Sequence, residues 1–271
     1  MLSKRPDGYH DLETLFERIG LCDEITLKKR PSGIVLKVSS REVPGGPQNL
    51  VFKAAKLLQE EYKTGKGVEI TLKKRIPVSA GLGGGSSNAA TVLLGLNRLW
   101  DLRLSKAKLL KIAAKLGSDV PFFILETPYA HGQGRGELLR PISRFRKKLW
   151  HCLVKPPFGI STQEAYRGLS KAGLTPQKAD VRMLLRALKT GDSERLSNLL
   201  TNSLELSLNK QLRTIQSIKK KLVFEGALAA LMSGSGSTVF GLFSSEPKAR
   251  NAARNLKKQH KSWKVFVAET Y

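Results

Sequence analysis

Cysteine is scarce in this sequence. The two cysteines, Cys22 and Cys152, are far apart and form no Cys-x-x-Cys motif, so their spacing indicates neither a disulfide framework nor a zinc site. The sequence also lacks a charged and then apolar leader, and no apolar run is long enough to span a bilayer. We therefore expect a soluble cytoplasmic protein without a membrane partner.

Acidic residues are few compared with basic ones. The 271 residues include 47 Lys and Arg but only 22 Asp and Glu, which gives a formal net charge of +25. Such a balance is compatible with nucleic-acid binding through phosphate contacts. However, the basic residues occur in short scattered runs without the interleaved aromatics of an RNA-recognition motif. We interpret them as a solvated basic surface that helps attract a polyanionic small molecule, and expect no nucleic-acid partner.

The order of expected elements divides the chain near residue 148. Residues 1–148 alternate strands with helices, which indicates an α/β domain. The strands are expected at 25–27, 34–38 and 69–74, and the helices at 49–62, 87–100 and 106–116. Ser105 is expected to cap the last of these helices, and Gly117 to end it in a left-handed conformation.

Residues 149–271 show a different order of elements, in which several helices follow the first strand. Strands are expected at 149–155, 227–232, 238–243 and 265–269, with a helix at 247–259 before the last strand. This is the split βαβ order of a ferredoxin-like domain. The expected fold is thus α+β with two domains, and the functional site is expected in the cleft between them.

The heptapeptide EITLKKR occurs twice, at Glu24–Arg30 and Glu69–Arg75. The flanking residues differ and no third copy follows, so a repeat architecture is not indicated. Both copies alternate apolar and polar residues, which is typical of half-buried strands.

A glycine-rich segment follows the second copy, where residues 79–91 read SAGLGGGSSNAAT. A strand, a glycine loop and a helix that starts with serines form an anion site, in which backbone N–H groups and the helix dipole face a phosphate. The lysine of a P-loop is missing after Gly85, and Ser86 stands where a dinucleotide-binding motif requires glycine. A flexible linker is the alternative, but linkers do not lead from an alternating strand into a strong helix.

Four segments in chain order carry a resemblance to a known family. They are KRPDGYHDLETLF (Lys4–Phe16), IPVSAGLGGGSSNAAT (Ile76–Thr91), GSDVPFF (Gly117–Phe123) and MSGSGSTVFGLF (Met232–Phe243). The set is similar to the superfamily of small-molecule kinases that includes galactokinase, homoserine kinase and mevalonate kinase, and most similar to its 4-diphosphocytidyl-2-C-methyl-D-erythritol kinase family. The resemblance implies ATP-dependent phosphorylation of the substrate's 2-hydroxyl, a step of the non-mevalonate isoprenoid pathway.

The resemblance assigns the first domain to ATP, bound with Mg²⁺. The nucleotide-binding residues that it implies are Asn49, Pro77, Val78, Ser79, Ala80, Gly81, Leu82, Gly83, Gly84, Gly85, Ser86, Ser87 and Asn88. Asn49 opens a helix and is either an ordinary cap or a nucleotide contact, and the sequence leaves both open. No cluster of carboxylates presents a Mg²⁺ site in the sequence, so we expect ATP phosphates and one or two protein groups to hold the ion.

Asp119 is the catalytic residue that the resemblance implies. It would accept the proton of the attacking hydroxyl, because phosphoryl transfer otherwise needs mainly positioning and charge stabilisation. The alternative is a helix N-cap, since an aspartate two residues before Pro121 often begins a helix.

The resemblance further implies a set of substrate-binding residues. They are Tyr9, His10, Arg135, Tyr166, Gly234, Ser235 and Gly236. The aromatic rings would stack on the cytosine, and Arg135 would meet the diphosphate. For Tyr166 taken alone, a position in a helix core is an equally good interpretation, and for His10 alone a surface histidine is the better one. The Gly-Ser-Gly segment would close the site from the second domain, with a simple hairpin turn as the alternative.

Members of the resembled family carry a further N-terminal strand with an Ala-Lys-Ile-Asn-like motif. Its lysine lies beside the catalytic aspartate. Residues 1–6 of this sequence are too short and too polar to pair usefully, and Lys4 cannot take that role. We expect codons upstream of Met1 to encode such a strand. Without it we expect the chain to be poorly active and prone to aggregation, because a sheet edge is exposed.

Two other functions stay open at this point. One is a related kinase acting on mevalonate-type alcohols or homoserine, and the other is an inactive basic relative that binds nucleic acid. The aromatic residues argue against the first, because those acceptors carry no base to stack. We expect a monomer or a weak homodimer.

Overall fold

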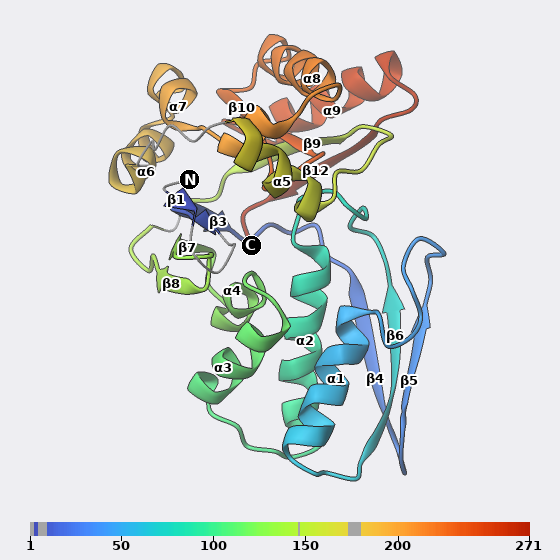
Figure 1. Cartoon of the computed structure of the whole chain (residues 1–271). Helices are drawn as coiled ribbons and strands as arrows, with labels where there is room; N and C mark the ends of the chain where they lie inside the picture. Colours follow the sequence, from blue (N-terminus) through green and yellow to red (C-terminus); the bar gives the residue numbers. More distant parts are fainter. Residues whose placement is uncertain (1–2, 5–9, 146, 173–179) are drawn as a thin grey trace.

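The computed structural model describes residues 3–4, 10–145, 147–172 and 180–271 (Figure 1). The first half of the chain contains the strands β1 (Ser3–Lys4), β2 (His10–Asp11), β3 (Thr14–Glu17), β4 (Glu24–Arg30), β5 (Ile34–Val38), β6 (Gly67–Lys73), β7 (Tyr129–Gln133) and β8 (Leu138–Pro141). Its helices are α1 (Leu50–Glu61), α2 (Gly84–Leu99), α3 (Lys106–Leu116) and α4 (Val120–Leu125).

The second half begins with β9 (Trp150–Lys155) and continues with α5 (Thr162–Ala172), α6 (Val181–Thr190), α7 (Ser193–Leu199) and the 3₁₀ helix η1 (Ser203–Ser207). It ends with α8 (Leu212–Phe224), β10 (Ala229–Met232), β11 (Val239–Phe243), α9 (Glu246–Gln259) and β12 (Lys264–Glu269). Within the described residues, no helix is both long enough and apolar enough to cross a membrane.

The two copies of EITLKKR lie side by side in the first half, which gives their recurrence a structural reason. β4 and β6 pair antiparallel, with Glu24 opposite Lys73 and Lys28 opposite Glu69. Because each copy has glutamate at one end and lysines toward the other, two antiparallel copies match opposite charges. The Lys73 ammonium lies 3.0 Å from Glu24 Oε1. β5 adds to β6 in parallel and completes the order β4-β6-β5.

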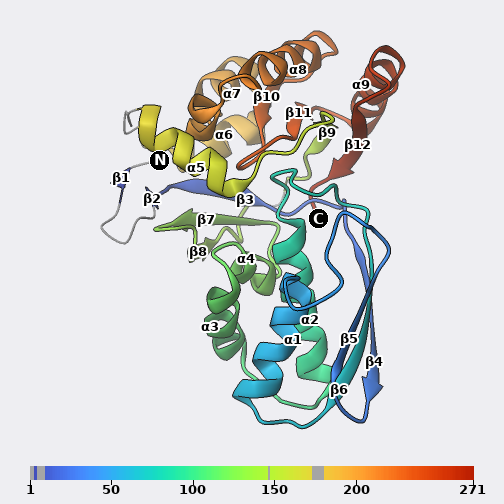
Figure 2. The ribbon, with the colours of Figure 1, turned by 45° about the vertical axis from the view of Figure 1, so that its right-hand side comes forward.

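Helices α1 and α2 cover one face of this sheet, and α3 packs beside them (Figure 2). Their buried apolar side chains meet those of β6 in one core. It includes Val51, Ala54, Leu58, Val68, Ile70, Leu72, Ala89, Val92, Leu93, Leu96 and Trp100. The core holds α2 against the sheet, so the glycine-rich segment that joins β6 to α2 is anchored at both ends.

The sheet of the second half has the order β10-β11-β9-β12 with every neighbouring pair antiparallel. Helices α8 and α9 pack on it and share one core, in which Ile215, Ile218 and Leu222 meet Ala249, Ala252 and Leu256. β9 is the first strand of this half, and β11 lies between β9 and β10 in the sheet. This is the split βαβ arrangement of a ferredoxin-like domain, as the sequence predicts.

The two halves are joined by the last residues of the chain. Thr270 bridges to Ile19, and the N–H of Tyr271 donates to the carbonyl of Arg18 (2.8 Å). The small sheet β3-β7-β8 lies beside this joint (Figure 2). Tyr129 of β7 is fully buried in an apolar cluster with Leu149 and side chains of α6 and α7. The division predicted at residue 148 stays a prediction.

Several expected boundaries differ in the structure. α2 begins at Gly84 instead of residue 87, so its first turn includes two glycines, whose low helix propensity gave no signal in the sequence. Gly117 follows α3 with a φ of 166°, which is extended backbone and not the predicted left-handed conformation. Ser3 and Lys4 do pair with β2, contrary to the expectation that this end is too short and polar to pair.

Candidate active site

The N-terminus of α2 has the geometry of an anion site. Gly83 occupies the N-cap with a φ of 62°, and Ser79 and Gly81 in the preceding loop also have positive φ values of 48° and 69°. The first N–H groups of a helix, here from Gly84 onward, have no partner within the helix. A left-handed residue next to helical backbone directs such groups into one concavity, where the helix dipole adds partial positive charge. The loop can therefore bind a phosphate through its backbone.

The glycine-rich loop before α2 meets the Gly-Ser-Gly segment 234–236 at this point. Ser233 Oγ donates to the carbonyl of Gly81 (2.9 Å), and the Thr238 N–H donates to the carbonyl of Ala80 (3.2 Å). A Cβ on Gly81 would lie only 2.0 Å from the Ser233 carbonyl oxygen, so the approach requires glycine. The segment 234–236 connects β10 to β11, so it is both a hairpin turn and a contact of the first loop.

Asp119 stands at the N-cap position of α4. In the described part of the chain its side chain makes no capping hydrogen bond, and its backbone is already helical (φ −86°, ψ −17°). The carboxylate is accessible to solvent, yet protein atoms lie on most sides of it. The resulting loss of hydration raises the pKa of Asp119 above its ordinary value. A carboxylate that is reachable, partly desolvated and not used as a cap is suited to accept a proton.

Tyr166 and His10, two of the predicted substrate residues, are neighbours in the structure. Burial raises the pKa of Tyr166 to about 12, and the negative charge of Asp119 contributes to this shift. The His10 ring is buried and its centroid lies 5.6 Å from that of Tyr166, at an angle of 40°. At this distance the two rings contact each other directly, so a base cannot be sandwiched between them and would stack on an outer face. Tyr9 lies outside the described residues.

Arg135 and Ser235, two further predicted substrate residues, lie in two different loops. Arg135 lies in the turn between β7 and β8, with its Nε 3.5 Å from Glu137 Oε1. The next residue, Gly136, has a Cβ position 3.9 Å from Asp119 Oδ1, which places this turn against the carboxylate. On another side, Ser235 Oγ is 3.2 Å from Thr162 Oγ1 at the start of α5. Of the predicted substrate residues, the structure thus brings Tyr166 and the turn that carries Arg135 close to Asp119, whereas the segment 234–236 contacts the loop before α2.

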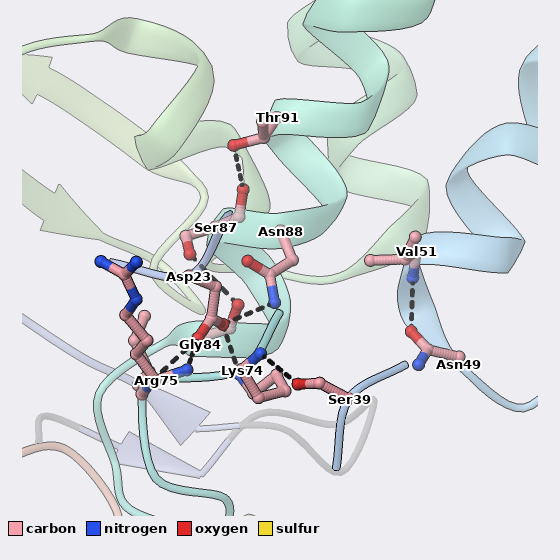
Figure 3. Close-up of polar contacts among 11 residues, drawn as sticks. Asp23, Ser39, Asn49, Val51, Lys74, Arg75, Gly84, Ser87, Asn88 and Thr91 are labelled. Carbon is pink, nitrogen blue, oxygen red and sulfur yellow. Dashed lines mark hydrogen bonds and ion pairs between the residues drawn. The ribbon is translucent and has the colours of Figure 1, made fainter. Parts of the chain in front are cut away.

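The predicted nucleotide residues Asn49 and Asn88 are buried and have protein partners (Figure 3). Asn49 Oδ1 accepts from the Val51 N–H (2.9 Å) and its Nδ2 donates to the Pro44 carbonyl (2.7 Å), so the residue is a helix cap. Asn88 lies in the second turn of α2 rather than the first, and its Nδ2 donates to Asp23 Oδ2 (2.8 Å). Contacts of either residue with ATP stay predictions.

Sequence reasoning missed Asp23. This residue precedes β4, and its side chain is fully buried beside Lys74, which is 9% exposed. Burial alone would raise the pKa of Asp23, but hydrogen bonds from Lys74, from two backbone N–H groups and from Asn88 lower it overall. The only signal in the sequence is its place next to the first EITLKKR copy, whose partner strand leads into the glycine-rich segment.

Comparisons with known proteins agree with this geometry. A model described as GHMP kinases N terminal domain matches residues 49–127, and one described as GHMP kinases C terminal matches residues 184–262. The chain is 43% identical to the 4-diphosphocytidyl-2-C-methyl-D-erythritol kinase of Pelotomaculum thermopropionicum, over all of this chain and 93% of that protein.

Solved structures show the same relationship. A crystal structure of a 4-(cytidine 5'-diphospho)-2C-methyl-D-erythritol kinase matches with a TM-score of 0.84 and 33% identity, over 99% of this chain and 93% of that one. The mevalonate kinase of L. major, solved in complex with R-mevalonate, matches with a TM-score of 0.73 and 20% identity, over 96% and 90% of the two chains, and shows the fold alone. The two-domain kinase fold expected from the sequence is confirmed, and the chain belongs to the GHMP kinases and, among them, to the 4-diphosphocytidyl-2-C-methyl-D-erythritol kinase family.

Proposed function

We propose that this kinase transfers the γ-phosphoryl group of ATP to the 2-hydroxyl of 4-(cytidine 5'-diphospho)-2-C-methyl-D-erythritol, in the non-mevalonate isoprenoid pathway. The observation that carries the proposal is the position of Asp119, an exposed carboxylate at the start of a helix whose Phe123 packs against Gly83, close enough to Tyr166 for its charge to raise the pKa of that ring. We propose further that the enzyme acts in the cytoplasm.

The bond changes follow from this arrangement. The 2-hydroxyl oxygen attacks the γ-phosphorus, its proton passes to the Asp119 carboxylate, and the bond between the γ-phosphorus and the bridging oxygen breaks to release ADP. The loop before α2 would hold the phosphates through its backbone N–H groups. The loop at 234–236, which contacts the first loop, would bring the second domain to the acceptor.

Magnesium would neutralise charge on the ATP phosphates. Mg²⁺ commonly binds phosphate oxygens, several waters and one or two carboxylates, without an all-protein site. In the part of the chain that the structure describes, no three His, Cys, Asp or Glu side chains come close enough to hold a metal. Such an ion would arrive with ATP and would be held mainly by the ATP phosphates.

Recognition of the cytidine would rest on Tyr166 and on the turn that carries Arg135. The partly exposed Tyr166 ring, with the buried His10 ring packed against it, would supply a stacking surface for the base. The Arg135 guanidinium, oriented by Glu137, would contact the diphosphate. Mevalonate and homoserine have neither a base nor a diphosphate, so these groups would contribute nothing to their binding.

A comparison of acceptors tests the proposal. The full chain is incubated with ATP, Mg²⁺ and either the cytidyl substrate, mevalonate or homoserine, and phosphorylated product is followed by ³¹P NMR. We expect kcat/KM for the cytidyl compound to exceed that for the other alcohols by at least about 100-fold, the scale of one stacked base plus one charge-assisted contact. Equal or better use of mevalonate or homoserine would contradict it.

A further inference from the structure

A single buried carboxylate connects the two ends of the loop at residues 77–83, which is called the phosphate loop here. The group consists of Asp23, Lys74, Asn88 and the backbone N–H groups of Arg75 and Ile76, and is called the Asp23 cluster here (Figure 3). Residues 74–76 immediately precede the loop, and Asn88 lies in the helix that follows it. The segments before and after the loop therefore both donate hydrogen bonds to the Asp23 carboxylate, which belongs to neither segment.

The hydrogen bonds use the full capacity of the carboxylate. Oδ1 accepts from the N–H groups of Arg75 (2.6 Å) and Ile76 (2.9 Å). Oδ2 accepts from the Lys74 ammonium and from Asn88 Nδ2 (2.8 Å). A carboxylate has about four lone-pair sites, and each of them here has a donor. Such a saturated buried acceptor fixes the directions of all its donors, because any shift leaves a buried polar group unpaired.

The cluster is also close to the anion site. A Cβ built on Gly84, the first residue of α2, would lie 3.4 Å from Lys74 Nζ. The positive charge of Lys74 is therefore near the helix N-terminus, but it is directed at Asp23 instead of extending as a P-loop lysine does. Ser39 reinforces the same segment, since its Oγ accepts from the Lys74 N–H (3.0 Å).

From this geometry we infer that Asp23 is a positioning residue, which sets the shape of the phosphate loop by fixing residues 74–76 and Asn88 relative to each other. It touches no substrate in this role. Phosphoryl transfer depends on placement of the γ-phosphate, and a displacement of about 1 Å can cost on the order of 100-fold in rate. The inference rests on the proposed function only where it concerns ATP.

The neighbouring residue supplies a matched control. Glu24 directly follows Asp23 and also pairs with lysine, but its contacts with Lys73 and Arg75 are on the surface. Glu24→Gln therefore removes the same charge one residue away, and among the described contacts it reaches the segment 74–76 only through the exposed Arg75 side chain and not through the backbone N–H groups that Asp23 holds. Asn88→Ala removes the hydrogen bond from the helix side. Hydrogen exchange of this variant without nucleotide tests the inference even if Asp23→Asn fails to fold, because no contact of Asn88 with ATP can contribute there.

Two measurements on the full chain test whether Asp23 positions the phosphate loop. Hydrogen exchange of the free protein reports on the backbone of residues 75–88, and calorimetry reports binding of a non-hydrolysable ATP analogue with Mg²⁺ and, separately, of the cytidyl substrate. We expect Asp23→Asn and Asn88→Ala to speed exchange in this segment and to weaken analogue binding about tenfold or more. Cytidyl binding should be unchanged, and Glu24→Gln should match the wild type throughout.

The outcomes separate the two proposals. If a folded Asn88→Ala or Asp23→Asn variant exchanges at the wild-type rate and binds the analogue with wild-type affinity, Asp23 does not position the loop. If Asp23→Asn and Asn88→Ala weaken binding of the cytidyl substrate as much as binding of the analogue, Asp23 supports the fold in general. That result also overturns the inference. If the wild type fails to bind the analogue, the proposed function is wrong, while the exchange data still decide whether the carboxylate holds the loop.

Discussion

Nε2 of His151 lies 3.1 Å from Oε2 of Glu17, although β9 and β3 belong to different halves of the chain. Glu17 Oε1 also accepts from Thr270 Oγ1 (2.5 Å), near the C-terminal end of the chain. Burial alone would lower the pKa of His151. The charge and hydrogen bond of Glu17, with the nearby carbonyls of Ala268 and Leu149, raise that pKa overall. The joint between the halves therefore contains a buried histidine–carboxylate pair, in which Glu17 increases the proton affinity of the His151 ring.

This pair makes the stability of the joint depend on pH. Because the folded-state pKa of His151 is raised, its contribution is fully present below the ordinary value of about 6.5 and is lost as pH rises through the folded value. We expect Glu17→Gln to cost about 3 kcal/mol of unfolding free energy at pH 5.5, and less at pH 9. Urea denaturation at both values measures this. Glu61→Gln, which breaks an exposed pair with Lys115, is the charge control. A cost that does not change with pH would contradict the assignment.

The adjacent residues Lys73, the last of β6, and Lys74 should differ greatly in their contribution to the free energy of unfolding. The Lys74 side chain is 9% exposed against a fully buried Asp23, whereas Lys73 is 58% exposed against Glu24. Lys74→Met leaves a buried carboxylate without its cation, and we expect a loss of about 3 kcal/mol in the free energy of unfolding. Lys73→Met should change it too little to measure. Similar losses for both variants in thermal unfolding would show that the burial of Asp23 does not matter.

Gly81 of the phosphate loop and Gly85 of α2 should respond to alanine with opposite signs. Gly81 has a φ of 69° and no room for a Cβ beside Ser233, so Gly81→Ala should destabilise by about 2 kcal/mol or more and separate the two loops. At Gly85, in the first turn of α2, no described atom lies within 4 Å of the Cβ position. Gly85→Ala should therefore gain about 0.5 kcal/mol from reduced chain entropy. Chemical denaturation of the free protein checks both, and a stable Gly81→Ala variant would refute the close approach.

Tyr166 should affect one substrate and not the other. If its ring stacks on the base, Tyr166→Ala should raise KM for the cytidyl substrate about tenfold or more and leave KM for ATP unchanged. Tyr166→Phe keeps the ring and serves as the matched control, with little change in either constant. Steady-state kinetics with each substrate varied in turn provides the test. A rise in KM for ATP would place Tyr166 with the nucleotide or in the core instead.

The sequence predicts elements best where periodicity and capping agree. Asn49 and Ser105 mark helices whose ends the structure reproduces, because each cap bonds within two or three residues of itself. The start of α2 is predicted three residues too late, because the two glycines of its first turn have low helix propensity.

Long-range partners could not be predicted at all. The Asp23 cluster joins residues more than fifty positions apart along the chain, as for Lys74 and Asp23. Likewise, the direct contact of His10 with Tyr166 excludes a base between them, and only the relative position of β2 and α5 reveals this. Asp119 is the reverse case, because a local motif suggested it and only its surroundings explain the raised pKa.

The most direct test of the account is turnover by Asp119→Asn with ATP and the cytidyl substrate both saturating. The change removes the proton acceptor and keeps the shape of the side chain, so kcat should fall about 100-fold or more while affinity for an ATP analogue stays the same. Because burial raises the pKa of Asp119, the neutral amide should also fold at least as stably as the wild type at pH 7. A variant with near-normal kcat would contradict the assignment of Asp119 as the base.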